Sequence, residues 1–141
     1  MDRHFYEPSA GTGLPHSPFN AIIAPRPIGW ISTRGTDGTF NLAPYSFFNA
    51  FCYTPPIIGF ASNGPKDTVV NIEETGEFCW NLVTRDLAEA MNVTSAGVDT
   101  HVDEFALAGL TPAPSTLIDA PHVAEARVFF ECRATQLLEL R

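Results

Sequence analysis

The chain has a single lysine, and it lies where a helix is expected to begin. Lys66 follows a Ser-Asn-Gly-Pro turn and precedes Asp67 and Thr68. The first turn of a helix exposes backbone N–H groups and the positive end of the helix dipole. An ammonium and a hydroxyl at this place would therefore form a compact seat for one phosphate group. The alternative is a solvated surface lysine, with Asp67 or Thr68 acting only as a helix cap.

A second candidate is the set of polar residues within an aromatic stretch. Asn41, Ser46 and Asn49 lie among Tyr45, Phe47 and Phe48. Buried amides and hydroxyls cost free energy unless they are paired. The stretch is therefore either a core strand whose polar groups bond to local turns, or a concave wall that faces a flat ligand.

Other reactive side chains point to no defined chemistry. His101 with Asp99 and Asp103 could form a metal trio, but a solvated acidic loop is the preferred interpretation, and no metal site is predicted. The cysteines Cys52, Cys79 and Cys132 form no close pair and lie among apolar neighbours, which indicates buried, reduced thiols. The phenylalanines at 47, 48, 51, 129 and 130 are predicted as core or dimer contacts rather than cofactor stackers.

The elements that must position the lysine are mostly short strands. Residues 19–33 predict two short strands or one kinked edge strand, because Pro25 and Pro27 prevent a single long one. Residues 34–39 predict a hairpin loop, with a return strand through 40–43. The apolar run 56–61 predicts a buried central strand that leaves through the turn before Lys66.

The second half of the chain adds two helices. A helix of two to three turns is predicted after Pro65, ending at Gly76, and a strand over 77–84. An Asp-x-x-Glu capping pattern at 86–89 predicts a second helix, with Gly97 as its stop. Residues 97–122 predict a long loop with one helical turn, and residues 126–140 a long strand. The dominance of strands predicts a closed or nearly closed barrel.

Composition excludes several classes of protein. Of the 141 residues, 45% are hydrophobic and 17% charged, which excludes a disordered tail and favours one packed domain. Sixteen acidic against eight basic residues give a net charge of −8, so no nucleic acid partner is predicted. The N-terminus shows no secretory signal pattern, and prolines interrupt the most apolar stretch, so a cytoplasmic protein without a membrane segment is predicted.

Taken in order, these segments resemble the flavin reductase-like, FMN-binding split-barrel family. The similarity rests on Pro-Arg-Pro-Ile-Gly-Trp-Ile-Ser-Thr at 25–33, Asn-Leu-Ala-Pro-Tyr-Ser-Phe-Phe at 41–48, Pro-Pro at 55–56, Phe-Ala-Ser at 60–62 and Lys-Asp-Thr at 66–68. It continues through Asn71-Ile72 and Glu77-Phe78 and covers roughly residues 18 to 135. The resemblance implies a six-stranded Greek-key split barrel with two or three short helices, in a homodimer with FMN at the subunit interface.

The same resemblance assigns the candidate cofactor-binding residues. Those expected to hold the ribityl chain and phosphate are Ser46, Asn49, Ser62, Lys66, Asp67 and Thr68, and Ala61 is also expected to bind the cofactor. Those expected to border the flavin ring are Trp30, Ser32 and the backbone of Ala43, Pro44 and Tyr45. No catalytic side chain is predicted, because hydride transfer depends on placing nicotinamide against flavin.

The resemblance implies an FMN-binding oxidoreductase that passes hydride from NADH or NADPH to flavin and serves a separate monooxygenase component. One alternative is an FMN-binding or electron-carrier protein that does not use free NAD(P)H. Another is a structural remnant that has lost its pocket. Family chains usually continue well beyond the position of Leu140, so residues 1–141 are predicted to form one domain that lacks the usual C-terminal strands.

Overall fold

The centre of the protein is a four-stranded antiparallel sheet in the order β2-β1-β5-β8. The computed structural model describes residues 1–100 and 102–140. The sheet strands are β1 (Gly29–Arg34), β2 (Phe40–Tyr45), β5 (Glu77–Asn81) and β8 (Phe129–Arg133). The β1–β2 hairpin forms at the predicted glycine- and aspartate-containing loop, where Gly35 N–H donates to the Thr39 carbonyl at 2.8 Å.

The strand register gives the sheet two different faces. Ile31 lies opposite Ala43 on one side and Trp80 on the other, so these side chains share one face. Trp30 lies opposite Pro44 and Asn81, and their side chains share the other face. Both faces are covered, which explains why β1 is buried along almost its whole length.

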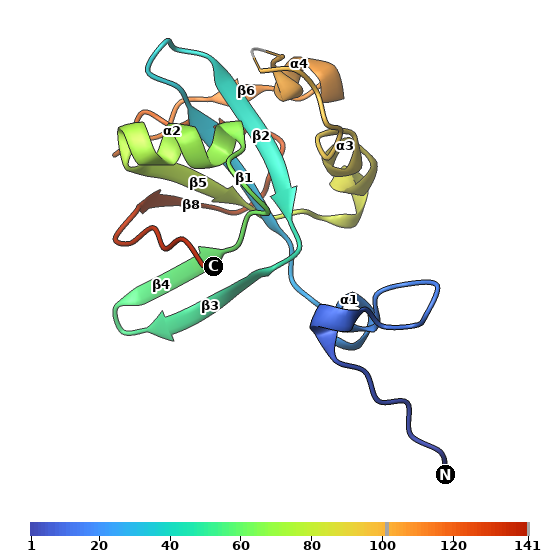
Figure 1. Cartoon of the computed structure of the whole chain (residues 1–141). Coiled ribbons are helices and arrows are strands. Elements are labelled where there is room, and N and C mark those ends of the chain that lie inside the picture. Colours follow the sequence, from blue (N-terminus) through green and yellow to red (C-terminus); the bar gives the residue numbers. More distant parts are fainter. Residues whose placement is uncertain (101, 141) are drawn as a thin grey trace.

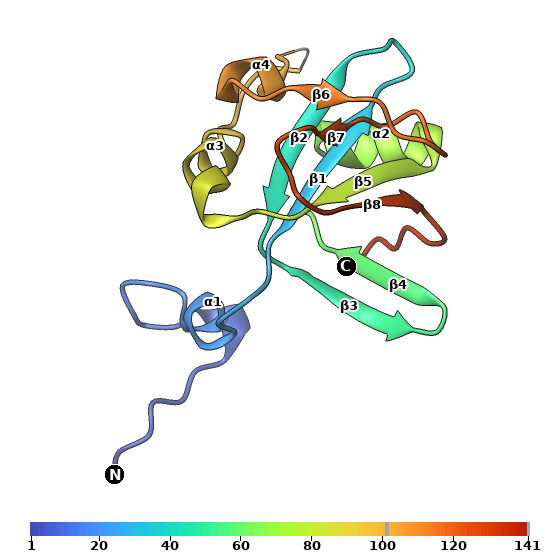
Figure 2. The ribbon, with the colours of Figure 1, turned by 180° about the vertical axis from the view of Figure 1, so that it is seen from behind.

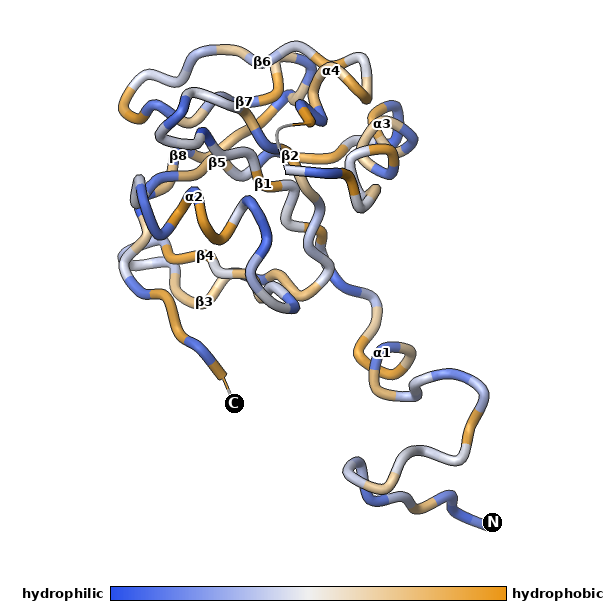
Figure 3. The backbone as a smooth tube through the Cα atoms, turned by 45° about the horizontal axis from the view of Figure 1, so that its top comes forward, coloured by the Kyte–Doolittle hydropathy of each residue, from blue (hydrophilic) through white to orange (hydrophobic). Residues whose placement is uncertain are grey.

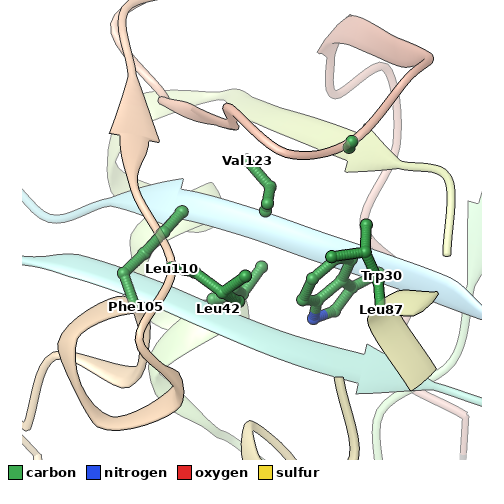
Figure 4. Packing of buried hydrophobic residues seen from close by; sticks show 7 residues of the cluster. Trp30, Leu42, Leu87, Phe105, Leu110 and Val123 are labelled. Carbon is green, nitrogen blue, oxygen red and sulfur yellow. The ribbon is translucent and has the colours of Figure 1, made fainter. Parts of the chain in front are cut away.

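One face carries the larger apolar cluster, which is drawn in Figure 4. Trp30 and Leu42 from the sheet meet Phe105 and Val123 from the later half of the chain, and all four are fully buried. The covering elements are α3 (Ala88–Val93), α4 (Glu104–Ala108), β6 (Pro112–Ala113) and β7 (His122–Val123). Figure 2 shows β6 and β7 crossing in front of the sheet strands on this side.

The opposite face is covered by α2 (Asp67–Thr75) and by the hairpin of β3 (Phe48–Tyr53) and β4 (Pro56–Phe60). Ile31, Tyr45, Ile72 and Phe78 form the buried cluster on this face. In Figure 1, α2 lies across the sheet with its N-terminal end near the end of β2. The helix is amphipathic, and hydrophobic and hydrophilic residues alternate along its tube in Figure 3.

The predicted helix after Pro65 is confirmed, and so is its end. Gly76 follows α2 with φ 71°, and its N–H donates to the Ile72 carbonyl at 2.8 Å. A residue with a side chain is strained in this left-handed conformation, which is why a glycine ends the helix. The cap prediction is wrong: Lys66 is the N-cap residue, and no side chain caps this helix.

Asn81 ties three elements together inside the protein. Its side chain is fully buried, and its amide donates to the Trp30 carbonyl at 3.2 Å and to Ser32 Oγ at 3.0 Å. Its Oδ1 accepts from Val123 N–H at 2.8 Å. The amide therefore joins β5 to β1 within the sheet and to β7 above it.

The N-terminal prediction of strands over 19–33 is wrong in its first half. Pro18–Ile22 forms the short helix α1, after a 3₁₀ turn, η1, at Pro8–Ala10. The following strand β1 is an inner strand of the sheet, not an edge strand. Proline at the first helical position favours a helix start, a signal that outweighed the β-branched residues here. Figure 1 shows this N-terminal segment reaching away from the sheet.

The prediction of a buried central strand over 56–61 is also wrong. Within the described part of the chain, strand β4 pairs only with β3, in a separate two-stranded sheet, and its residues are exposed or half-buried. Apolarity alone does not distinguish a core strand from one that exposes an apolar face. The expectation of three buried thiols fails for the same reason, since Cys52 on β3 is exposed while Cys79 is buried.

Two later boundaries differ from the predictions. The second helix is split into η2 (Arg85–Leu87) and α3, with no side-chain cap from Asp86, and α3 ends at Val93, before Gly97. The C-terminal strand ends at Arg133, and residues 134–140 form no strand. The predicted helical turn within 97–122 is confirmed as α4, which Asp103 caps by accepting from Phe105 N–H at 2.9 Å.

The fold is mainly β with a few short helices, as predicted. The described strands form three separate sheets, so a single closed six-stranded barrel is not seen. Among the described residues, no helix has the length and apolar character needed to cross a membrane.

Candidate anion-binding site

The site is built where the β3–β4 hairpin passes into α2. After β4, the chain turns through residues 61–65, and Ser62 Oγ donates to the Gly64 carbonyl at 3.0 Å. Gly64 has φ 80°, a conformation that favours glycine. Lys66 follows in an extended conformation, φ −120° and ψ 165°, and α2 starts at the next residue. The turn therefore sets the lysine directly at the N-terminus of a nine-residue helix.

Lys66 lies above the ring of Tyr45. Its Nζ is 5.9 Å from the ring centroid, within the range of a cation–π contact. Within residues 1–100 and 102–140, no carboxylate forms an ion pair with this ammonium. The positive charge of Lys66 therefore adds to that of the helix N-terminus and is available to an anion.

Tyr45 contributes a buried hydroxyl to the same place. The residue is 5% exposed, and its hydroxyl makes no hydrogen bond within the described chain. Burial raises the pKa of Tyr45, and the neighbouring hydroxyls of Thr68 and Ser62 offset part of that rise. An unpaired buried hydroxyl costs free energy, so a polar group that reached it would be stabilised.

Thr68 is held by a buried chain of hydrogen bonds. Its Oγ1 donates to Asn41 Oδ1 at 2.6 Å, and Asn41 Nδ2 donates to Glu104 Oε1 at 3.0 Å. Glu104 Oε2 accepts from Leu42 N–H at 3.1 Å. The chain fixes the first turn of α2 to the edge of β2 and to α4.

Asp67 points toward a shallow acidic hollow beside α2. Its Oδ1 accepts from Thr100 Oγ1 at 3.3 Å. The hollow, about 230 Å³, is lined by Asp67, Asp37 and Glu74 together with threonine and asparagine side chains. Neither Lys66 nor Ser62 lines it, so this acidic hollow and the lysine are separate features of the surface.

Ser46, Asn49 and Ala61 lie at the start of the hairpin and at its return. The Ser46 carbonyl accepts from Arg26 Nε at 3.1 Å, and Ala61 N–H donates to the Phe47 carbonyl at 2.9 Å. Asn49 Oδ1 accepts from Ala50 N–H at 2.8 Å. All three predicted residues are exposed.

The structure places Trp30 and Ser32 on the face of the sheet opposite to α2. Trp30 is fully buried in the cluster on the opposite face of the sheet, where Nε1 donates to Thr94 Oγ1 at 3.0 Å. Ser32 is also fully buried and donates to the Pro121 carbonyl at 2.5 Å. Pro44 shares their face by register, whereas Ala43 and Tyr45 share the face of α2. Neither the Trp30 nor the Ser32 side chain lines a surface beside Lys66.

Glu104 is a buried polar residue that the sequence did not predict. It lies in the segment predicted as a loop, yet it is 5% exposed and bonded to β2. Asn41 lies in the polar stretch, but its bond to Glu104 has no signal in the sequence. The one available signal for Glu104 was the Asp103 cap just before it, which places the next residue in a first helical turn.

The other side chains considered in the sequence, which are phenylalanines, cysteines and a histidine, are not part of this site. Phe48 stacks on Trp80 with ring centroids 5.8 Å apart, whereas Phe51 is 74% exposed. Burial raises the pKa of the Cys79 thiol to about 11. His101 lies outside the described residues, and no group of three metal-ligating side chains occurs among the described ones.

The fold defines a mainly β protein, with a candidate anion site between a hairpin and a helix. The sequence profile of the flavin reductase like domain matches residues 23–140, so the chain belongs to the flavin reductase-like family. An uncharacterized protein of Aquifex aeolicus is 43% identical over 117 residues, covering 79% of this chain and 60% of its own length. The chain thus spans about three-fifths of that relative.

Two solved structures show the same fold. Nitrilotriacetate monooxygenase component B from Bacillus cereus matches with a TM-score of 0.83 and 29% identity, over 96% of this chain and 70% of its own. Flavoredoxin of Desulfovibrio vulgaris matches with a TM-score of 0.77 and 26% identity, over 82% of this chain and 63% of its own.

Proposed function

We propose that this protein binds FMN and acts as an oxidoreductase of the flavin reductase type, with NADH or NADPH as the hydride donor. The observation that carries the proposal is Lys66: an ammonium without a carboxylate partner among the described residues, at the start of α2 and above the buried ring of Tyr45. Membership of the flavin reductase-like family supports the choice of a flavin as the ligand.

The residues around α2 fit a phosphate monoester. Lys66 supplies the counter-charge, and the first turn of α2 supplies backbone N–H groups. Ser46, Asn49, Ala61 and Ser62 would carry the ribityl chain, along the hairpin that leads into this turn. Bound flavin would supply the two-electron chemistry, while the protein supplies binding and orientation.

We assign no acid or base to a side chain. Hydride transfer needs the donor carbon held near the flavin acceptor atom, and correct placement alone can contribute several kcal/mol to lowering a barrier. Ala43 and Tyr45, on the face of α2, remain the proposed border of the ring. The other three predicted ring residues lie on the opposite face of the sheet, where they would only support β1 and β2: Trp30, Ser32 and Pro44.

A monooxygenase component is the proposed consumer of reduced flavin. The support is the similarity to component B of nitrilotriacetate monooxygenase, a protein named as part of such a system. We also propose that two copies form a homodimer, with the exposed β3–β4 hairpin in the contact.

The test is oxidation of NADH and NADPH by the full-length protein with and without FMN. Flavin-dependent loss of reduced nicotinamide absorbance is expected, and its absence in a sample that binds FMN would exclude the reductase. FMN binding without oxidation of NADH or NADPH would favour an electron carrier, which the similarity to flavoredoxin supports. A folded sample that does not quench FMN fluorescence would exclude both.

A further inference from the structure

Glu104 is a buried carboxylate that the proposed function does not use. It lies in α4, far from α2 in sequence, and is 5% exposed. In the described part of the chain, no lysine or arginine forms an ion pair with it. Its two oxygens instead accept from Asn41 Nδ2 at 3.0 Å and from Leu42 N–H at 3.1 Å.

The chemistry of these groups fixes the direction of the hydrogen bonds. An ionised carboxylate only accepts, so the NH₂ group of Asn41 must face Glu104. The carbonyl oxygen of Asn41 then faces Thr68, and an amide oxygen also only accepts. The hydroxyl of Thr68 must therefore donate to Asn41, as the 2.6 Å contact shows.

Thr68 has only one hydroxyl hydrogen, and this bond uses it. The side chain is 1% exposed, and toward Tyr45 it can offer only its oxygen lone pairs. A phosphate beside Lys66 would thus meet the ammonium and backbone N–H groups, but no donated hydrogen bond from the Thr68 hydroxyl.

We propose that Glu104 is a positioning residue of the phosphate site, which acts through Asn41 to withhold the Thr68 hydroxyl from the bound anion. This proposal rests on the proposed function, because it takes the phosphate of FMN as the anion. In this proposal Glu104 controls the preference of the site for FMN over riboflavin, which lacks the phosphate.

The substitution Glu104→Gln tests the direction of the chain with little change of shape. Leu42 N–H still needs an acceptor, so the new amide oxygen is expected to take that place and its NH₂ group to face Asn41. The Asn41 amide then turns over and donates to Thr68, which releases the Thr68 hydrogen. We expect FMN to bind roughly three- to tenfold more tightly, with riboflavin affinity unchanged.

Removal of a buried negative charge would also favour an anion, so the hydroxyl effect must be isolated. The isosteric Thr68→Val removes the hydroxyl and can be made both in the parent protein and in E104Q. The gain in FMN affinity from E104Q should be smaller in proteins that also carry T68V. The matched control is Glu125→Gln, because Glu125 also accepts from a backbone N–H, that of Thr111 at 3.1 Å. E125Q should leave the ratio of FMN to riboflavin affinity unchanged.

Three results would overturn the positioning role: unchanged or weaker FMN binding by E104Q, a gain of the same size in the T68V background, or an equal gain from E125Q. Equal affinities of the unsubstituted protein for FMN and riboflavin would overturn the phosphate site itself. An NMR measurement that needs neither flavin nor a variant separates failure of the hydrogen-bond chain from failure of the phosphate site. The Asn41 side-chain amide protons should exchange slowly with solvent, and rapid exchange would overturn the hydrogen-bond chain.

Discussion

At the scale of single residues, the character of Lys66 comes from what surrounds it. The protein carries a net charge of −8, yet no carboxylate neutralises this ammonium among the described residues. The aromatic ring of Tyr45 beneath it contributes a weak attraction that leaves the ammonium hydrogens free to bond elsewhere. Such a cation costs little to hold at the surface and remains available to a ligand.

The first prediction concerns this lysine. Lys66→Ala should weaken FMN binding by about 1–3 kcal/mol, the range for a charge-assisted hydrogen bond, and should leave riboflavin binding unchanged. Fluorescence titration with both flavins measures the difference. Arg34→Met is the matched control, because Arg34 also lies over a ring, that of Phe40 at 6.0 Å. Equal losses for both flavins would contradict a phosphate role.

The second prediction follows from the burial of Glu104. Burial raises the pKa of this carboxyl above its ordinary value, with backbone and Asn41 hydrogen bonds offsetting part of the rise. As pH rises above the ordinary glutamate pKa, the unfolded chain ionises more readily than the folded one, so this group makes the fold less stable. E104Q should therefore gain stability relative to the parent as pH rises above the ordinary glutamate pKa of about 4.3.

Urea unfolding across this pH range checks the sign. Glu131→Gln is the control of opposite sign, because the backbone N–H groups of Thr116 and Leu117 lower the pKa of Glu131. The stabilisation from Glu131 is present above the ordinary pKa and lost as pH falls through the lowered one. A stability difference for E104Q that did not change with pH would show that Glu104 has an ordinary pKa.

At the scale of elements, the sheet depends on polar contacts that link its strands to the covering segments. Glu104 satisfies the N–H of Leu42 on the edge strand β2, and Asn81 satisfies that of Val123 on β7. A bare edge strand would expose N–H and C=O groups to pairing with another chain. The covering segments are therefore held by directed hydrogen bonds as well as by the apolar cluster.

The third prediction tests this link. Asn81→Leu keeps a similar volume but leaves Val123 N–H without its acceptor, and it removes the donor to the Trp30 carbonyl. The free energy of unfolding should fall by about 2–4 kcal/mol, the range for buried groups left unpaired. Asn49→Leu at an exposed position is the control and should change stability by less than about 0.5 kcal/mol. Urea denaturation measures both values.

Prediction of the elements succeeded where local chemistry is strong. Pro65 and Gly76 predicted the two ends of α2, and the loop 34–39 predicted its hairpin. It failed for residues 18–22 and 56–61, where apolar residues do not lie in the core. Their neighbours in space, which the sequence does not list, decide whether such residues form a core strand, a helix or an exposed hairpin.

At the scale of the whole molecule, apolar side chains remain uncovered on the β3–β4 hairpin. Phe51 is 74% exposed and Tyr53 92%, and Ile57 on β4 is also exposed. Several large apolar side chains left exposed on one hairpin favour a contact with another protein. This supports the proposed homodimer, with the hairpin at its centre.

The fourth prediction is that the protein sediments at twice the mass of its chain. The paired substitution Phe51→Glu with Tyr53→Glu should return it to the mass of one chain, because two buried charges would have to be desolvated in the contact. Leu117→Glu is the control, since Leu117 is 73% exposed on a different segment and should leave the mass unchanged. A parent protein with the mass of one chain would exclude this dimer.

The sequence by itself determined the family, the mainly β class and the presence of one lysine at a helix start, because these depend on local residue types and their spacing. It did not determine that Trp30 and Ser32 face away from that lysine, or that Glu104 reaches Asn41 across 63 positions. Strand register decides which face a side chain takes, and chain packing decides which distant groups meet. Both result from the burial of the whole sheet, so only the tertiary structure settles them.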